Sequence, residues 1–392
     1  MLYIVAQFFK VLGFVLHSVP MGIWFAGLPL AILCLLINGK NSNRFARRIF
    51  VQLPIMLAIG INFGIVPLLF TQTLFFKPFY TATILMAWCW FAVVPILIVG
   101  YYSVYLASFS AAASGLIQPV SNKNKKVNKR NKNSGSNKIR TIIFGIIASI
   151  CLITIGIMIV NAQTLMVRSD LWLPIMERTG FYGATTGLAN NMNDPSVWIR
   201  LATVFAISLI TTGVWSIFDS YFLLRKKTES DSDTKSDTEY QRWTLSFALV
   251  ITIIASIMLA GIGCLTAGLK IDGFVSSKIS ELTVTELSVF TVSTVATAIA
   301  GLVILAMKLC IGLQGKILAA LVVIAQLTAI TGFGIIRQLG QNMRLHQYVD
   351  SARTLQIAWE AFIPFLIIFV IGAIVVGWML RQLVAGRNIK PV

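Results

Sequence analysis

The sequence has little charge and few acidic residues. Asp and Glu supply 14 of 392 residues, charged residues of both signs make up 12%, and 57% of the chain is apolar. Soluble domains carry about 25% charged residues, so these proportions exclude an ordinary soluble enzyme. The mean hydropathy of +0.83 is also far above that of a soluble domain of this size. The composition indicates an integral membrane protein with several spans.

Cysteine, histidine and nucleotide-binding motifs are equally sparse. The five cysteines form no CxxC or CxxCH pattern, which gives no support to covalent haem attachment or a cysteine zinc site. No GxxxxGK[ST], GxGxxG or HExxH motif is present. With only two histidines, His17 and His346, the chain cannot supply the four axial ligands of a bis-histidine haem bundle.

Long apolar runs between charged or turn-rich segments predict an all-α, polytopic membrane helix bundle with nine transmembrane helices. We interpret residues 1–392 as a single transmembrane domain. A helix needs about 20 apolar residues to cross the hydrocarbon core. Residues 2–9 either extend the first helix outward or lie at the membrane interface. The predicted spans are 11–37, 49–70, 79–106, 141–160, 197–224, 243–269, 287–311, 317–336 and 358–380.

Basic residues fall on alternate connections and predict the orientation. Lys and Arg gather in 40–48, 121–140, 225–242 and the C-terminal tail, whereas the opposite connections hold few. By the positive-inside rule this places the N-terminus outside and the C-terminus in the cytoplasm. The net charge of +18 therefore reflects topology, and we expect no nucleic-acid partner. The expected location is the lipid bilayer of the bacterial cytoplasmic (inner) membrane.

Three connections are long. The basic connection 108–140 and the charged connection 225–242 lie on the cytoplasmic side and carry few apolar residues, so we expect the first to be disordered and both to be solvated. Anionic lipid head groups are a further candidate partner of the first. Residues 163–196 are predicted to form an extracytoplasmic loop.

Strongly polar side chains within the spans are functional candidates because they are costly there. His17 lies one to two turns inside span one, and Asn62 lies at a similar depth in span two. His17 is either a ligand or a hydrogen-bonded structural residue, and Asn62 is either part of a site or interhelical glue. Other polar residues toward the same side are Gln72, Asn161, Gln163, Thr203, Gln338 and Gln341.

This pattern resembles subunit I of the cytochrome bd quinol oxidases and the divergent bd-like membrane proteins related to it. That family has nine spans with the N-terminus outside. His17 occupies the position of the family's first-helix histidine, a haem axial ligand, and Gly60-Ile61-Asn62-Phe63 is similar to its second-helix sequence. Further short matches, in the family's order, are 160–163, 194–200 and 334–343.

The sequence departs from the family at the other haem positions. Thr203 stands where the family has a second haem-ligating histidine, Gln338 where it has a haem-ligating glutamate, and Gln341 where it has an arginine beside that haem. The connection 270–286 is too short for the family's quinol-binding loop. The resemblance therefore implies at most one haem b, with His17 as metal ligand and Asn62 beside it, no catalytic residues, and no oxygen reduction by this chain.

Three functions are open at this stage. The first is a membrane subunit of an electron-transfer complex that keeps one haem near the outer face, with the quinone pool and other membrane or extracytoplasmic electron-transfer subunits as partners. The second is a haem-free structural subunit that scaffolds a membrane complex, and the third is a small-solute transporter. If His17 binds haem, its second ring nitrogen is expected to hydrogen-bond. The candidate partners are Ser18, Asn62, or a backbone carbonyl freed by Pro20 or Pro29.

Overall fold

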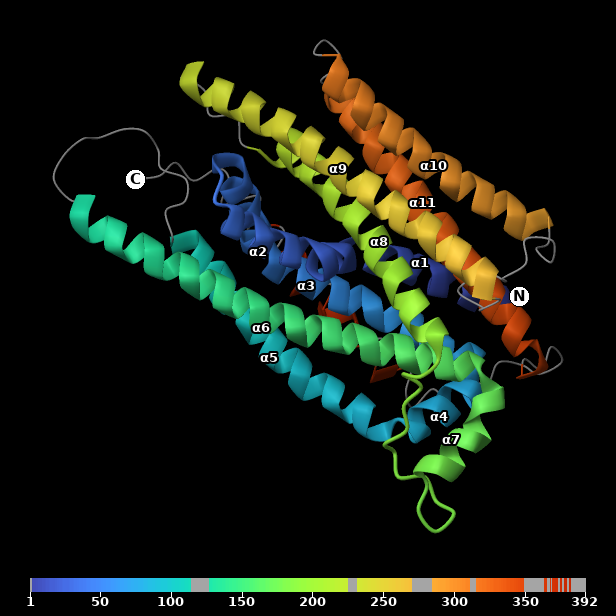
Figure 1. Ribbon diagram of the computed structural model, residues 1–392. Helices are drawn as coiled ribbons and strands as arrows, with labels where there is room; N and C mark the ends of the chain where they lie inside the picture. The colour runs from blue at the N-terminus through green and yellow to red at the C-terminus, as the bar shows by residue number, and fades with distance from the viewer. Residues whose placement is uncertain are drawn as a thin grey trace.

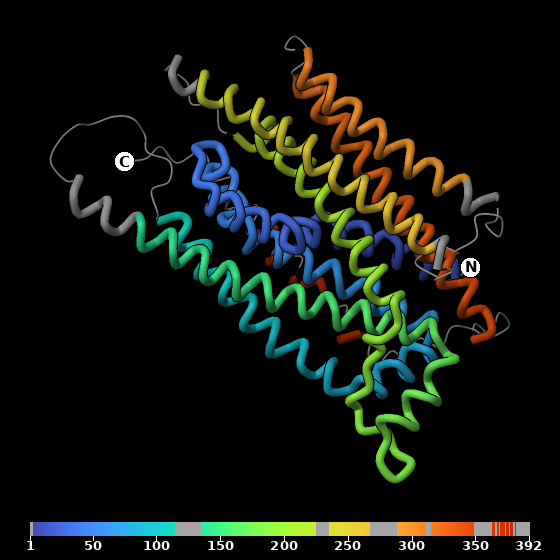
Figure 2. The backbone as a smooth tube through the Cα atoms, in the orientation of Figure 1, coloured from blue at the N-terminus to red at the C-terminus, as the bar shows by residue number. Residues whose placement is uncertain are grey.

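The computed structural model describes residues 2–113, 127–224, 231–269, 284–310 and 315–348, together with several helical positions between 363 and 381. Within these residues the chain is helical apart from short turns and the connection 180–194. The prediction of an all-α membrane bundle is confirmed. The long helices lie side by side in one bundle (Figure 1), and the backbone tube shows the same arrangement (Figure 2).

Eight helical segments of the described residues are long and apolar enough to cross a membrane. The ninth predicted span, 358–380, falls mostly outside the described residues, and the positions described within it are helical. The eight segments are α1 (Leu2–Gly22) continuing through η1 (Ile23–Gly27) into α2 (Leu28–Ile37), α3 (Lys40–Leu74), α5 (Ala87–Ala113), α6 (Val127–Val167), α8 (Pro195–Phe218) continuing into η3 (Asp219–Leu223), α9 (Asp231–Leu269), α10 (Val284–Leu309) and α11 (Lys316–Leu345).

The third predicted span, 79–106, is wrong at its beginning. A separate short helix, α4 (Phe76–Leu85), is followed by a one-residue break at Met86, and α5 begins at the next residue. Phe79 and Leu85 of α4 are buried in an apolar cluster with Leu165 at the end of α6. Both sides of the break are apolar, so hydropathy alone gives no sign of it.

Helices also extend into the predicted cytoplasmic loops. α5 and α6 occupy the two ends of the predicted loop 108–140, and residues 114–126 lie outside the described part of the chain. α9 begins within the predicted loop 225–242. Residues 127–140 of the loop 108–140 are helical, and the disorder expected for that loop stays a prediction. A helix already nucleated in the membrane propagates into polar sequence without a new nucleation cost.

The first span changes its helical register in the middle. Ile23–Gly27 forms a π-helical turn, η1, and Pro20 and Pro29 lie on either side of it. Proline lacks the backbone N–H that continues the hydrogen-bond ladder, and a π turn is one way to accommodate such an interruption. After the turn the neighbours differ: α1 lies against α3, α8 and α11, whereas α2 lies against α3 and α6.

Candidate functional site

Polar side chains gather at two levels of the bundle. The outer cluster lies toward the beginning of α1 and consists of Lys10, Gln163, Arg337 and Gln341. The inner cluster lies toward the beginning of α3 and consists of Arg44, Arg48, Gln52, Trp215, Asp219 and Asp237. The two names follow the charge-based orientation, which stays a prediction.

Amide groups link the cations of the outer cluster. Lys10 Nζ donates to Gln341 Oε1 at 2.5 Å. Gln341 Nε2 and Arg337 Nη2 both donate to Gln163 Oε1, at 3.2 and 3.3 Å. The four side chains come from α1, α6 and α11, so the cluster ties three spans together.

Aromatic faces complete the surroundings of the two cations. Lys10, which is 1% exposed, has its Nζ 4.6 Å from the centre of the Phe75 ring, and the Arg337 guanidinium lies 4.7 Å from that of Phe14. A ring face attracts a cation by about 2 kcal/mol when water is excluded. In the described part of the chain, neither cation forms an ion pair with a carboxylate. Lys10 is not among the residues predicted from the sequence, because the predicted first span begins at residue 11.

The side chains at the family's other haem positions bond within the protein. Gln338 Nε2 donates to Asn342 Oδ1 at 2.8 Å on the next turn of α11, and Gln341 accepts from Lys10. Thr203 Oγ1 donates to the Ile199 carbonyl at 2.8 Å within α8. Each of these polar groups therefore has a protein partner where the family has a haem ligand or a residue beside one.

His17 packs against a groove of small residues on α3. Its Nδ1 lies 2.7 Å from the Gly60 carbonyl oxygen, so Nδ1 carries the proton and Nε2 does not. A Cβ on Gly64 would lie 2.7 Å from the same ring atom, and the Trp24 ring packs edge-on at 5.7 Å. The expected hydrogen bond to a backbone carbonyl is present, but the carbonyl belongs to Gly60. Ser18 instead donates to the Phe14 carbonyl.

Asn62 does not point toward His17. Its Nδ2 donates to the Ala58 carbonyl at 3.0 Å within α3, and its Oδ1 lies against Gly372, where a Cβ would come within 1.9 Å. Two residues along a helix correspond to a rotation of about 200°, so Asn62 faces away from the side on which Gly60 meets His17. The two predicted cofactor-binding side chains therefore do not converge, and the role of Asn62 stays a prediction.

The surroundings of His17 match a haem ligand in one respect and fail in another. A ligating histidine commonly donates its other N–H to a carbonyl, as Nδ1 does here. A cavity of about 680 Å³ lies between α1, α3, α8 and α11, but His17 does not line it, although its neighbour Leu16 does. As packed, the described residues provide the tautomer of a haem ligand, but Trp24 and Gly64 lie against the ring and the cavity is not lined by His17, so they do not fit a haem.

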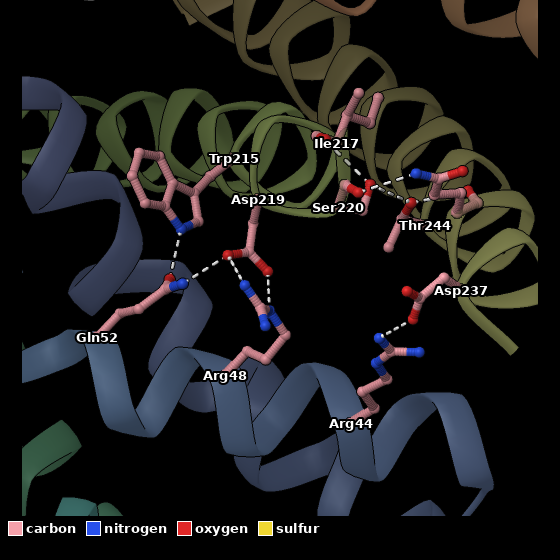
Figure 3. Close-up of polar contacts among 10 residues, drawn as sticks. Arg44, Arg48, Gln52, Trp215, Ile217, Asp219, Ser220, Asp237 and Thr244 are labelled. Carbon is pink, nitrogen blue, oxygen red and sulfur yellow. Dashed lines mark hydrogen bonds and ion pairs between the residues drawn. The ribbon is translucent and has the colours of Figure 1, made fainter. Parts of the chain in front are cut away.

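The inner cluster is built around one buried carboxylate (Figure 3). Asp219, which is 3% exposed, accepts two hydrogen bonds from Arg48, one of them at 2.6 Å, and a third from Gln52 Nε2 at 2.5 Å. Gln52 Oε1 in turn accepts from Trp215 Nε1 at 2.9 Å. These contacts join α3 to α8 and η3, and every polar atom of Gln52 is used.

A second ion pair extends the inner cluster to α9. Arg44 Nη2 donates to Asp237 Oδ1 at 2.5 Å, and the Arg44 guanidinium lies 4.4 Å from the centre of the Tyr240 ring. Asp237 lies in the first turns of α9, in the segment predicted as loop. The contact gives a physical reason for that segment to be ordered.

The predicted outer loop, 163–196, is largely structured. After α6 come η2 (Ser169–Leu171) and α7 (Trp172–Thr179), and Asn161 Oδ1 accepts from the backbone N–H of Asn191 at 3.0 Å. Asp194 caps α8 by accepting from the Ser196 N–H at 2.9 Å, and Arg168 Nη1 donates to it at 2.8 Å. The match at 194–200 therefore marks a helix start with proline in its first turn.

Two carboxylates of this loop have lowered pKa values. The hydrogen bond from Arg168 is the main cause that lowers the pKa of Asp170. Burial acts to raise the pKa of Asp194, but hydrogen bonds from Ser196 and Asn191 and the charge of Arg168 outweigh it and keep that pKa below its usual value. Both side chains are therefore ionised at neutral pH, and Asp194 joins Arg168 of the loop to the start of α8.

Comparison with known proteins gives a fold and no closer relationship. No protein-family model matches the chain, and no curated protein matches it. The solved structure of bd oxidase from Geobacillus thermodenitrificans is similar, with a TM-score of 0.59 and 11% identity over 99% of this chain and 99% of that one. At this identity the likeness shows the fold alone. The predicted resemblance is thus confirmed as a distant bd-oxidase-like fold of a multi-pass membrane protein.

Proposed function

We propose that this chain is a membrane-embedded subunit of an electron-transfer complex, that it holds other subunits, and that it does not itself reduce oxygen. The observation that carries the proposal is the bonding of Thr203, Gln338 and Gln341. Each stands where the resemblance expects a haem ligand or a residue beside one, and each bonds to a protein group. Haem irons in proteins take imidazole, thiolate, thioether or phenolate ligands, and the resemblance adds a glutamate carboxylate; these three side chains offer none of them.

The extent of the fold supports a scaffolding role. The similarity to the bd oxidase structure covers 99% of both chains, so the helical framework is retained while the ligand side chains are exchanged. One exchanged position on α11, Gln341, contributes to the bonds that join α1, α6 and α11, whereas Gln338 bonds within α11. A framework held by its own polar groups keeps its shape without a cofactor and can still present its outer helix faces to partner subunits.

A second candidate is the same subunit with a single haem b at His17 near the outer face. The bond between His17 Nδ1 and the Gly60 carbonyl favours it, because it leaves Nε2 as the coordinating atom. This candidate requires the ring to turn out of its present packing against Trp24. The quinone pool and an outer partner would then be the expected electron donor and acceptor.

A visible spectrum of the full-length protein, with extracted haem counted, separates these candidates. The protein is purified from membranes of cells supplied with haem. We expect no stoichiometric haem in the wild type, and we expect other membrane subunits to copurify with it. A Soret band that disappears in His17→Ala and persists in Ser18→Ala, with both variants inserted, would establish the second candidate. Quinol-dependent oxygen consumption by the isolated chain would contradict both.

A further inference from the structure

The cavity of about 680 Å³ is an elongated apolar space with polar groups among its lining. On α3 it is lined by one continuous stripe at spacings of three and four residues, so a single helix face forms its wall. That stripe consists of Arg48, Gln52, Ile55, Ile59 and Phe63. The opposite walls come from Pro20 and neighbouring residues of α1 and from Trp215 and Phe218 of α8. The volume is in the range of small-molecule sites, about 300 to 1,000 Å³.

The cavity is bordered by side chains that face apolar surroundings. Leu16 of α1, Val51 of α3 and Leu327 of α11 all line it, and they are 40%, 45% and 40% exposed. In a membrane protein, apolar side chains exposed on the spans face lipid chains or another subunit. The cavity therefore borders on the outer surface of the bundle, which lipid chains or another subunit cover.

The polar groups at the α3 end differ in what they can still bind. Arg48 is neutralised by Asp219, and the amide of Gln52 is used by Asp219 and Trp215. Arg47, the next lining residue, donates only to the carbonyls of Ala111 and Ala112 at the end of α5, at 3.3 and 3.5 Å. In the described residues it has no carboxylate partner. The group free to take a ligand is thus a half-buried guanidinium.

A guanidinium at the end of an apolar cavity selects its ligand by charge. Arginine binds phosphate oxygens in pairs with parallel N–H groups. A quinone carbonyl can accept from a guanidinium N–H but carries no charge to neutralise it, and the Trp215 N–H and one N–H of Gln52 are already bonded within the protein. Basic pockets between transmembrane helices on the cytoplasmic side bind anionic lipid head groups, and the charge pattern predicts that side for Arg47.

We propose that this cavity binds an anionic phospholipid of the cytoplasmic leaflet. One acyl chain lies between α1, α3 and α8, and the phosphate pairs with Arg47. The site is independent of any haem and of the electron-transfer proposal.

Quenching of tryptophan fluorescence by brominated lipids tests the site directly, because Trp215 lines the cavity. The full-length protein is reconstituted in phosphatidylcholine vesicles with increasing amounts of brominated phosphatidylglycerol or, in parallel, brominated phosphatidylcholine. The difference between wild type and Trp215→Phe isolates the Trp215 signal from the other tryptophans. We expect half-quenching of Trp215 at an about fivefold lower mole fraction of phosphatidylglycerol, the effect of one basic residue.

A matched pair of arginine variants tests whether Arg47 causes the preference for phosphatidylglycerol. Arg47→Gln should lose the preference for phosphatidylglycerol. Arg140→Gln removes the same charge from an exposed position of α6 that does not line the cavity, and it should keep the preference. An equal loss in both variants would show a general surface-charge effect and overturn the proposal.

The wild type alone can also overturn the proposal, whatever the stability of the variants. Equal quenching of Trp215 by both lipids, or no quenching by either, is incompatible with an anionic lipid in the cavity. Unlabelled phosphatidylglycerol should relieve the quenching. Relief by a short-chain quinone, with none by unlabelled phosphatidylglycerol, would assign the cavity to a quinone.

Discussion

Arg48 in the inner cluster and Lys10 in the outer cluster are both cations enclosed by helices, but their partners differ in kind. Arg48 faces the carboxylate of Asp219, whereas Lys10 has an amide oxygen and a ring face. A charged pair depends on both members, because loss of one leaves an uncompensated charge. A cation held by neutral groups leaves only a vacant hydrogen bond when it is removed. The inner cluster should therefore be the more fragile of the two.

The inner and outer clusters are named from the predicted orientation of the chain in the membrane. Cysteine labelling in intact cells tests that orientation and gives an all-or-none result. In a chain with its five cysteines replaced, Leu188→Cys and His346→Cys, both at exposed positions, should react with an impermeant reagent. Asn131→Cys and Thr234→Cys should react only after lysis, because the positive-inside rule keeps basic connections in the cytoplasm. Labelling of position 131 in intact cells would show that the chain has the opposite orientation, and the cluster named inner would then lie on the outer side.

Breaking the Arg48 pair should have the largest effect on stability. We expect Asp219→Asn to lower the free energy of unfolding by about 3 to 5 kcal/mol, because Arg48 keeps its charge inside the bundle. Thermal unfolding in detergent measures this. The control is Asp170→Asn, which removes an exposed partner of Arg168 and should cost less than about 1 kcal/mol. Equal losses of unfolding free energy in the two variants would contradict the view that the buried ion pair makes the inner cluster fragile.

The contact between α1 and α3 near His17 should tolerate no added methyl group. A Cβ on Gly60 would lie 2.0 Å from Cη2 of Trp24, so we expect Gly60→Ala to cost about 1 to 3 kcal/mol through displaced packing. Gly135→Ala in α6 is the matched control, since nothing lies within 4 Å of its added atom. Unfolding temperatures of the two variants give the comparison, and an unchanged Gly60→Ala variant would contradict the packing.

The outer loop should weaken in acid. Because the folded-state pKa of Asp194 is lowered, its charge stabilises the fold above the unfolded pKa of about 3.9, and this is lost as pH falls through the folded pKa. Asp194→Ala should cost about 1 kcal/mol at neutral pH by loss of the cap. Asp194→Asn, which keeps a capping oxygen, should flatten the acid limb of a plot of unfolding temperature against pH. An unchanged limb would assign the acid sensitivity elsewhere.

Removing the buried amine of the outer cluster should have the smallest effect. Lys10→Met leaves Gln341 Oε1 without its donor but also removes a charge from an enclosed site. The two effects oppose each other, so we expect the free energy of unfolding to stay within about 1 kcal/mol of the wild type. The same thermal assay applies. A loss as large as that of Asp219→Asn would show that Lys10 has a charged partner after all.

Hydropathy and charge predicted most of the fold and little of its polar interior. Apolar runs locate spans because lipid demands them, and seven of the eight observed spans contain their predicted ranges within a few residues. The break at Met86 escaped because no polar residue marks it. The burial of Asp219 could not be predicted from its neighbours in sequence, because it depends on Arg48, which is 171 positions away.

The residue types of the candidate site could be predicted from the sequence, but the contacts that these residues make could not. His17 was singled out as a rare polar residue in a span, and its bonded carbonyl was expected in kind. Its position against Gly60 depends on the pairing of α1 with α3, which cannot be deduced from spacing. Asn62 was grouped with His17 by depth, whereas rotation about the α3 axis separates them.

The π turn at Ile23–Gly27 divides the first span into two halves that pack against different helices. A substitution in α1 can alter the contact with α11, and a substitution in α2 can alter the contact with α6, although both helices belong to the same span. Deleting one residue from the turn would rotate α2 by about 100° relative to α1 and present a different set of side chains to α6. The two halves of this span can therefore diverge separately in sequence, provided that the length of the turn between them is kept.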